Sequence, residues 1–314
     1  MGGIAGVLLV VAADEGLMPQ TLDHLEILDL LDIQQGIVVL TKIDLVEDDG
    51  WLGLVETEVQ NKIANTSLKG SPVVRVSTKT GKGLDDLKEL MQEVSLRSPI
   101  YKHSGSSRLA VDRVFKIQGF GTIVTGTLLD GYLRTGEEVE ILPKKNRSRI
   151  RSLQTHNTKI EEAQPGSRTA VNLANVRKED IKRGDVLTKP GTYRPTSRLD
   201  AGIRLISERG MNLKHNDRVK FHTGTSCTLA RVRVLGSARL GSAESGFVQL
   251  ELDEPICVKT GDHYIIRQAS PSRTIGGGVI LDPYPVGRYK LNDSQKINQL
   301  IAKHRGSLRD QMLS

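Results

Sequence analysis

Residues 109–129 read LAVDRVFKIQGFGTIVTGTLL, and this segment decides how the chain is interpreted. Two runs rich in β-branched and aliphatic residues, 109–115 and 122–129, flank the tripeptide Gly119-Phe120-Gly121. Such runs, separated by a short glycine-containing segment, predict a β-hairpin. Glycine suits the turn because a tight reversal needs positive φ, which a residue with a Cβ atom resists. Alone, the hairpin predicts part of a β-barrel and no function.

The charge of the chain is divided unevenly along its length. Of 314 residues, 44 are Lys or Arg and 37 are Asp or Glu, which gives a net charge of +7. Residues 1–98 hold 8 basic and 16 acidic residues, which leaves 36 and 21 for the remainder. A basic block joined to an acidic one predicts that the basic block meets a polyanion. The alternative is that basic surface only keeps the β-rich part in solution.

The acidic block has the pattern of a parallel α/β domain. The apolar run 7–13 shows no alternation, which is typical of a strand buried on both faces. A segment with helical spacing opens at Pro19 and ends at Gly36, and a second buried strand covers 37–40. A helix at 52–66, a strand at 73–76 and a helix at 84–94 repeat the unit. We therefore expect half of a doubly wound domain in residues 1–98.

Polar residues follow two of these strands. They are Thr41, Lys42 and Asp44 after the second strand and Ser77, Thr78 and Lys79 after the third. Ligands of such sheets bind at the carboxyl ends of the strands. A carboxylate there can accept hydrogen bonds from N1–H and the exocyclic amine of guanine, and a lysine stem can lie along the base. The pattern favours guanine binding; the alternative is an ordinary loop that ends in an N-cap aspartate.

Beyond residues 96–107, a linker rich in Pro, Gly and Ser, helical periodicity gives way to short strands. Five or six strands at 106–190 predict one small closed barrel, and a second set at 195–283 predicts another. The triplet Gly276-Gly277-Gly278 resembles a phosphate loop, but we favour a bulged strand where backbones approach closely. Residues 284–314 resume helical spacing, with Gly306 as an expected stop, and are too few for a core of their own.

Two cysteines, Cys227 and Cys257, lie in strand-like runs without metal-binding spacing. We expect both to pack in cores, and their low number fits a reducing cytoplasm. No apolar run reaches the roughly 20 residues of a membrane span, so we expect no membrane partner.

Several segments resemble the translational GTPases. The segments TKID and VSTK are similar to the NKxD and SAK motifs of that superfamily, with Thr41 in place of Asn and Thr78 in place of Ala. Three segments closely resemble the selenocysteine-specific elongation factors: VDRVFKIQGFGTIVTGTL, EEAQPGSRTAVNLANVRKEDIKRGDVL and RTIGGGVILDP. The resemblance implies an α/β plus all-β chain: a partial P-loop-GTPase-type domain, two elongation-factor barrels and the start of a winged-helix region.

The resemblance also implies partners. Members of the family bind GTP or GDP with Mg²⁺ and deliver selenocysteinyl-tRNA to the ribosome at recoded UGA codons, and their C-terminal winged-helix domains bind an mRNA hairpin. A selenolate is anionic where serine carries a neutral hydroxyl, so a cationic aminoacyl pocket can tell them apart. By resemblance this pocket draws on Asp112, Arg113 and Arg168, with His156 as a further candidate. Two alternatives to a pocket role remain: a pairing of Arg113 with Asp112 that only stabilises the barrel, and an ordinary surface position for His156.

Contacts to tRNA phosphates are expected from basic residues of the barrels. These are Arg147, Arg149, Arg151, Lys214, His215, Arg218, Lys220, Arg231 and Arg233.

The 314 residues contain no G-x-x-x-x-G-K-[ST] motif, since Gly81-Lys82 is followed by Gly83 and has no upstream glycine. The switch threonine and the D-x-P-G-H motif of the family are missing too, and with them the Mg²⁺ ligands. We expect this polypeptide to be a fragment that does not hydrolyse GTP alone, which a turnover assay checks. Two alternatives remain: a general aminoacyl-tRNA factor of the elongation factor Tu type, and a non-enzymatic RNA-binding remnant.

Overall fold

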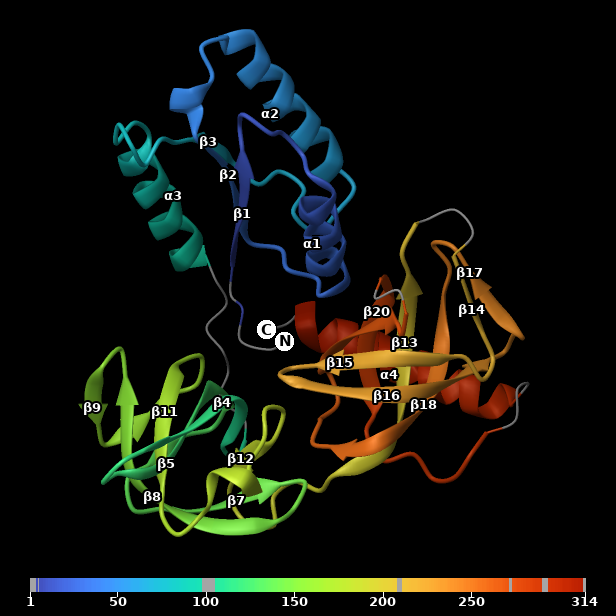
Figure 1. Cartoon of the computed structure of the whole chain (residues 1–314). Helices are drawn as coiled ribbons and strands as arrows, with labels where there is room; N and C mark the ends of the chain where they lie inside the picture. The colour runs from blue at the N-terminus through green and yellow to red at the C-terminus, as the bar shows by residue number, and fades with distance from the viewer. Residues whose placement is uncertain are drawn as a thin grey trace. The chain divides into compact units, whose positions relative to one another are not determined.

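The computed structural model describes residues 4, 6–97, 105–207, 211–270, 273–289 and 293–312. The chain divides into two compact units, with the boundary between residues 100 and 101. The first unit is an α/β domain, and the second contains two β-barrels and one helix (Figure 1). Within the described ranges, no helix has both the length and the apolar character that crossing a membrane requires.

The first unit alternates strands and helices around a parallel sheet of order β1-β2-β3. Its elements are β1 (Val7–Ala12), α1 (Pro19–Leu30), β2 (Gly36–Thr41), a 3-10 turn (Ile43–Leu45), α2 (Asp49–Ile63), β3 (Val73–Arg75) and α3 (Leu84–Arg97). Apolar residues of α1 and α2 pack on one face of the sheet, and those of α3 pack on the other (Figure 1). The α/β prediction is confirmed, except that α1 ends at Leu30 and Gly36 opens β2.

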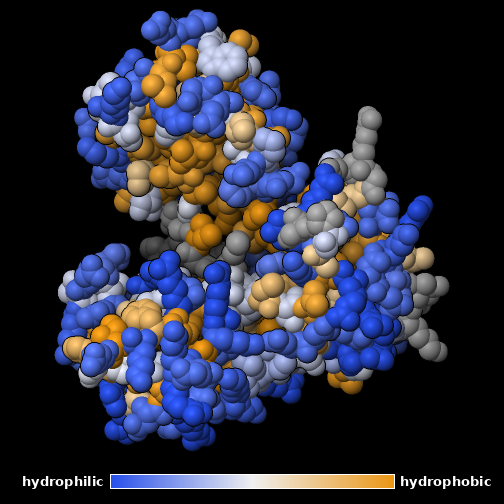
Figure 2. Space-filling model, in the orientation of Figure 1, coloured by the Kyte–Doolittle hydropathy of each residue, from blue (hydrophilic) through white to orange (hydrophobic). Residues whose placement is uncertain are grey.

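The prediction that the first strand is buried on both faces is wrong. Leu9 and Val11 are buried, but Leu8 and Val10 are 40% and 55% exposed. The register places these two beside Ile37 and Val39 of β2, on the face that α3 covers. Helix α3 packs over β2 and β3, so β1 is an edge strand whose side chains on that face remain exposed. Figure 2 shows apolar surface gathered over this part of the first unit.

The first barrel closes as predicted. Its strands are β4 (Arg108–Ile117), β5 (Gly121–Asp130), β6 (Leu133–Arg134), β7 (Glu138–Leu142), β8 (Asn146–Thr155), β9 (Thr158–Ile160), β10 (Glu162–Ala163), β11 (Arg168–Leu173) and β12 (Val186–Thr188), with a 3-10 turn at Lys178–Asp180. The order β11-β5-β4-β12-β7-β8 returns to β11 through the β11–β8 pairing. The hairpin predicted at residues 109–129 is formed by β4 and β5; Gly119 lies in its turn with φ of 82°, and Gly121 opens β5 with φ of 94°.

The second barrel is a closed ring of order β13-β18-β16-β15-β19-β20. Its strands, with the small β14–β17 pair, are β13 (Thr196–Leu205), β14 (Asn212–Lys214), β15 (Arg218–Thr223), β16 (Ser226–Leu235), β17 (Arg239–Gly241), β18 (Ser245–Ile256), β19 (His263–Gln268) and β20 (Thr274–Asp282). The Gly276 to Gly278 triplet lies inside β20. A Cβ on Gly278 would lie 2.2 Å from the Gly202 carbonyl oxygen, and the pairings of β20 contain register shifts. The bulged-strand interpretation is therefore confirmed.

Helix α4 (Ser294–Met312) packs against the second barrel. Leu300 is fully buried and shares a cluster with Leu235 and Leu281 of the barrel. The predicted stop at Gly306 is wrong, because the helix continues through it to Met312. A single glycine costs a helix about 1 kcal/mol, which does not by itself end it.

The two cysteines differ in environment. Cys257 is buried beside Leu142 and Val186, where the two barrels meet, and burial raises the pKa of its thiol to about 12. Cys227 is exposed on β16, so the prediction that it packs in a core is wrong. The alternation of β16 places it on the outer face, opposite His222.

Candidate functional sites

The loops that follow β2 and β3 are joined by a hydrogen bond. Ser77 Oγ donates to Asp44 Oδ1 at 2.6 Å, although the two residues are 33 positions apart. Ser77 is fully buried, and its hydroxyl also accepts from the Thr80 N–H at 3.1 Å. Asp44 itself is exposed at the carboxyl edge of the sheet. The structure thus brings together two loops that the sequence assigned to one site.

The Asp44 carboxylate is held in its charged form. The hydrogen bond from Ser77 lowers the pKa of Asp44 below its usual range, and the nearby charge of Lys79 acts in the same direction. At neutral pH the group is therefore an acceptor with two oxygens. Such a carboxylate can receive two N–H donors from guanine, whereas adenine presents a different edge.

Lys42 is held by two carboxylates that the sequence analysis missed. Its backbone is left-handed, with φ of 57°, and its Nζ lies 3.3 Å from Asp14 Oδ2 and 3.1 Å from Glu15 Oε1. The hydrogen bonds that Lys42 donates to Glu15 and Asp14 raise the pKa of its ammonium group. Both acidic residues follow β1. Ligands of such sheets bind at the carboxyl ends of the strands, and applying this rule to β1 as well as to β2 and β3 would have identified them.

The remaining predicted residues of these loops have simpler surroundings. Thr41 Oγ1 donates to the Val11 carbonyl at 3.3 Å, so it ties β2 to β1 and does not brace a neighbouring loop. Thr78 and Lys79 are exposed at the start of the loop after β3. That loop requires glycine at its end, because a Cβ on Gly83 would lie 2.0 Å from the Arg75 carbonyl oxygen.

On the first barrel, a β-bulge places Asp112. Val111 pairs with Gly126 and Arg113 pairs with Thr125, which leaves Asp112 as the extra residue of β4. A bulge redirects a side chain relative to the regular alternation of a strand. Thr125 Oγ1 donates to Asp112 Oδ1 at 2.6 Å. Gly126 permits the close approach of the strands, since a Cβ there would lie 2.1 Å from the Ala110 carbonyl oxygen.

Arg168, at the start of β11, forms a bidentate pair with Asp112. Its Nε lies 3.0 Å from Oδ2 and its Nη2 lies 3.1 Å from Oδ1. Nη2 is also 3.4 Å from Thr125 Oγ1. Among the described residues no acceptor binds Nη1, and the side chain is 55% exposed. The pair therefore fixes one edge of the guanidinium and leaves another for a ligand.

Both members of this pair are charged at neutral pH. Burial acts to raise the pKa of Asp112, but hydrogen bonds from Arg168 and Thr125 outweigh it and bring the pKa below its usual range. The same hydrogen bond raises the pKa of Arg168. The guanidinium is thus oriented without losing its charge.

Arg113 lies close to this pair in the strand register, and His156 lies in the turn between β8 and β9. Arg113 is opposite Thr125 and Arg168 is opposite Thr127, so the two arginines flank β5 from its two sides. Arg113 is exposed, and no hydrogen bond joins it to Asp112 in the described part of the chain, but the charge of Arg113 contributes to lowering the pKa of Asp112. His156 Nδ1 is 3.3 Å from Thr155 Oγ1, which donates to the Arg168 carbonyl at 3.2 Å.

The basic residues predicted to contact phosphates fall into two sets. Arg147, Arg149 and Arg151 alternate along the outer face of β8. On the second barrel Arg218 pairs with Asp253, and Arg233 Nε lies 3.0 Å from Glu251. Lys214 is exposed, Lys220 and His215 are half-buried, and Arg231 is exposed beside Arg233 on the same face of β16.

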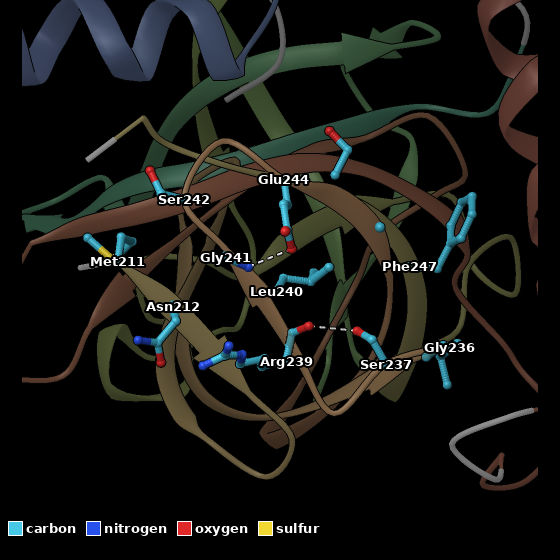
Figure 3. A pocket seen from close by; sticks show the side chains of 13 residues that line it. Met211, Asn212, Gly236, Ser237, Arg239, Leu240, Gly241, Ser242, Glu244 and Phe247 are labelled. Carbon is cyan, nitrogen blue, oxygen red and sulfur yellow. Dashed lines mark hydrogen bonds between the residues drawn. The ribbon is translucent and has the colours of Figure 1, made fainter. Parts of the chain in front are cut away.

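A separate hollow of about 800 Å³ lies where the small β14–β17 pair meets the second barrel (Figure 3). Met211, Leu240 and Phe247 line it together with small and polar residues. Its polar groups bind one another: Ser237 Oγ donates to the Arg239 carbonyl at 2.7 Å, and Glu244 Oε2 accepts from the Gly241 N–H at 2.7 Å (Figure 3). None of the predicted site residues lines it.

Comparison with known proteins assigns each part of the chain to a family of domains. Residues 2–97 match the elongation factor Tu GTP-binding domain, residues 121–188 match elongation factor Tu domain 2, and residues 201–286 match the β-barrel domain of selenocysteine-specific elongation factors.

Curated relatives agree with this assignment. Over 281 residues the chain is 45% identical to the selenocysteine-specific elongation factor of Desulfomicrobium baculatum, covering 90% of this chain and 44% of the relative. Over 291 residues it is 30% identical to that of Haemophilus influenzae, covering 92% and 45%. The chain thus spans about half the length of the curated relatives it matches.

Solved structures give the same result. The crystal structure of a bacterial selenocysteine-specific elongation factor aligns with a TM-score of 0.85 at 27% identity, covering 98% of this chain and 50% of that one. The translation elongation factor SelB of Methanococcus maripaludis, solved with a GTP analogue, aligns with a TM-score of 0.79 at 29% identity, covering 90% and 66%. As a whole the chain is therefore similar to the selenocysteine-specific elongation factors, and its second barrel matches the barrel domain of that family.

Proposed function

We propose that this chain carries the guanine-recognition loops and the aminoacyl-tRNA barrels of a factor that delivers selenocysteinyl-tRNA to the ribosome at recoded UGA codons. Residues 2–97 match a GTP-binding domain, which supports GTP or GDP as the nucleotide. In this proposal Asp44 accepts the guanine N–H groups, while Ser77 orients the carboxylate. Lys42 and Lys79 supply positive charge beside the base, and Thr41 and Thr78 shape the loops.

The observation that carries the proposal is the Asp112–Arg168 pair. The Asp112 carboxylate and the Thr125 hydroxyl hold the Arg168 guanidinium, and Nη1 donates no hydrogen bond to any described residue. A selenolate placed at Nη1 gains a charge-assisted hydrogen bond, whereas a serine hydroxyl gains only a neutral acceptor interaction. In this proposal Arg113 adds positive charge from the other side of β5, and His156 borders the pocket.

Mg²⁺ accompanies the nucleotide in the family. Within the described ranges no three His, Cys, Asp or Glu side chains lie close enough to hold a metal ion. We therefore assign no Mg²⁺ ligands among the described residues.

The ribosome and an mRNA hairpin complete the proposed set of partners. The match of residues 201–286 to a barrel domain of selenocysteine-specific factors favours this function over a general elongation factor Tu-type carrier. Contacts of the basic barrel residues with tRNA phosphates would make the affinity fall steeply with salt. In the family an mRNA hairpin is bound by the C-terminal winged-helix domains. We expect α4 to be the start of that region.

The test replaces Arg168 by Ala and by Lys and measures the dissociation constants of selenocysteinyl-tRNA and seryl-tRNA. Losing a hydrogen bond to a charged partner costs about 1.5–3 kcal/mol, so Arg168→Ala is expected to weaken selenocysteinyl-tRNA roughly tenfold or more while seryl-tRNA is little affected. Arg168→Lys keeps the charge but loses the bidentate geometry, and an intermediate value is expected. Equal weakening of both tRNAs in Arg168→Ala would contradict the assigned role.

A further inference from the structure

The outer face of the second barrel carries a cavity of about 420 Å³, and half of the residues that line it are arginines. Four arginines line it, with one central glutamate: Arg198, Arg231, Arg233, Arg288 and Glu251. The strand register explains the cluster, because Glu251 of β18 is directly opposite Arg198 of β13 and Arg231 of β16. Directly opposed residues project on the same face of a sheet.

The charge of this cluster is not balanced within it. Arg288 Nε lies 2.6 Å, Arg233 Nε 3.0 Å and Arg198 Nη2 3.8 Å from Glu251 Oε1. Three guanidinium groups therefore share one carboxylate. Arg231 adds a fourth positive charge and makes no ion pair with any described residue. Asp253, which also lines the cavity, is paired with Arg218.

Two of the arginines, Arg198 and Arg233, are held in place before any ligand arrives. The side chains of Arg233 and Glu251 are only 19% and 16% exposed. Arg198 Nε is buried without a hydrogen-bond partner in the described part of the chain. Burial acts to raise the pKa of Glu251, but the arginines outweigh it and bring the pKa below its usual range, so the carboxylate keeps orienting them at neutral pH. Preorganised donors bind a ligand with a smaller loss of conformational entropy.

We propose that this cavity binds a phosphate group. Guanidinium donors match phosphate oxygens in geometry, often in pairs, and the excess positive charge needs an anion of more than one oxygen to satisfy it. The phosphate belongs either to an RNA backbone or to a free phosphate compound, since the chemistry of recognition is the same. This inference deepens the proposed contacts of Arg231 and Arg233 with tRNA phosphates and to that extent rests on the proposed function, but it does not depend on the nucleotide site or on the Asp112–Arg168 pair.

The experiment titrates the full 314-residue chain with pyrophosphate at constant ionic strength, using calorimetry, and then adds an oligoribonucleotide as competitor. Arg231→Ala is the main variant because it breaks no ion pair with a described residue, so the fold should be retained. Arg288→Ala is a second variant from a different segment. Arg239→Ala, an exposed arginine of β17 outside the cavity, is the matched control for loss of charge.

Compared with the unmodified chain, binding should weaken roughly tenfold or more in Arg231→Ala and Arg288→Ala, the usual effect of losing one charge-assisted hydrogen bond, and stay unchanged in Arg239→Ala. Displacement of pyrophosphate by the oligoribonucleotide assigns the site to an RNA backbone. Failure of RNA to displace it assigns the site to a free phosphate compound. Absence of pyrophosphate binding to the unmodified chain, or equal weakening in the Arg239→Ala control, would overturn the proposal.

Discussion

Arg108 of the first barrel and Asp262 of the second form a bidentate ion pair, with Nη1 2.5 Å from Oδ2 and Nη2 2.8 Å from Oδ1. Arg108 is only 5% exposed. Asp130 lies beside it at 3.5 Å and binds Lys259 of the second barrel at 2.5 Å. Two positive and two negative side chains thus join the barrels, and each barrel contributes one of each sign.

Removing Arg108 should destabilise the second unit. Breaking a buried ion pair by deleting one partner costs about 3–5 kcal/mol, because the remaining charge stays buried, so we expect Arg108→Met to lose about 3 kcal/mol in the free energy of unfolding. Urea unfolding measures this. Arg177→Ala, which removes an exposed pair with Asp180 in the same unit, should change stability by less than about 1 kcal/mol. Similar losses in both variants would show that the buried pair is not what holds the barrels together.

A methyl group at Gly126 should disturb the bulge that presents Asp112. The Cβ of Gly126→Ala would lie 2.1 Å from the Ala110 carbonyl oxygen, and forced overpacking costs about 1–3 kcal/mol. We expect a lower melting temperature together with weaker aminoacyl-tRNA binding. Gly53→Ala is the control, since its Cβ meets nothing within 4 Å on α2, and Ala in place of Gly in a helix gains about 0.5–1 kcal/mol. Destabilisation by both changes would contradict this interpretation.

Ser77 should matter for nucleotide affinity more than its small side chain suggests. Ser77→Ala removes the hydrogen bond to Asp44 and leaves the Thr80 N–H without its acceptor. A buried hydrogen-bonding group left without its partner costs about 1–3 kcal/mol, so we expect guanine-nucleotide affinity to fall roughly tenfold. Titration with a fluorescent GDP analogue measures this affinity. Thr57→Ala on α2, whose hydroxyl binds its own helix, should leave affinity unchanged. Unaltered binding in Ser77→Ala would remove Ser77 from the site.

The Asp112–Arg168 pair should make stability depend on pH at the acid end. The folded pKa of Asp112 lies below its unfolded value of about 3.9, so the contribution of the pair is present above pH 4 and is lost as pH falls through the folded pKa. Because Arg168 is more than half exposed, the contribution is at most about 1 kcal/mol. The difference in unfolding free energy between the unmodified chain and Asp112→Asn should therefore shrink between pH 7 and pH 3. A difference that grows on acidification would reverse the assigned sign.

The sequence predicts element order well, because periodicity and glycine placement report local structure. Both barrels, the β4–β5 hairpin and the bulged β20 follow from alternation and from Gly119, Gly121 and Gly278. Exposure of Leu8 and Val10 was not predictable in the same way, since an apolar run does not reveal which neighbour covers it. The extent of α4 past Gly306 was missed because a single glycine is only a weak helix terminator.

The sequence does not predict which side chains of the sites contact one another when they are far apart along the chain. Thr125 as the third member of the Asp112–Arg168 cluster depends on a one-residue bulge, which no periodicity reports. The tie from Lys42 to Asp14 and Glu15 depends on three parallel strands that end together. Glu251, at the centre of four arginines, becomes visible only when β13, β16 and β18 are in register.

Recognition of charge on the aminoacyl group by Arg168 predicts an order of affinities among three tRNAs. Dissociation constants of the unmodified chain are compared for selenocysteinyl-tRNA, cysteinyl-tRNA and seryl-tRNA at neutral pH. A cysteine thiol with a pKa of about 8.5 is mostly neutral there, while the selenol is ionised. We predict that selenocysteinyl-tRNA binds roughly tenfold or more tightly than the other two, which resemble each other. Equal affinities for all three would contradict charge recognition by Arg168.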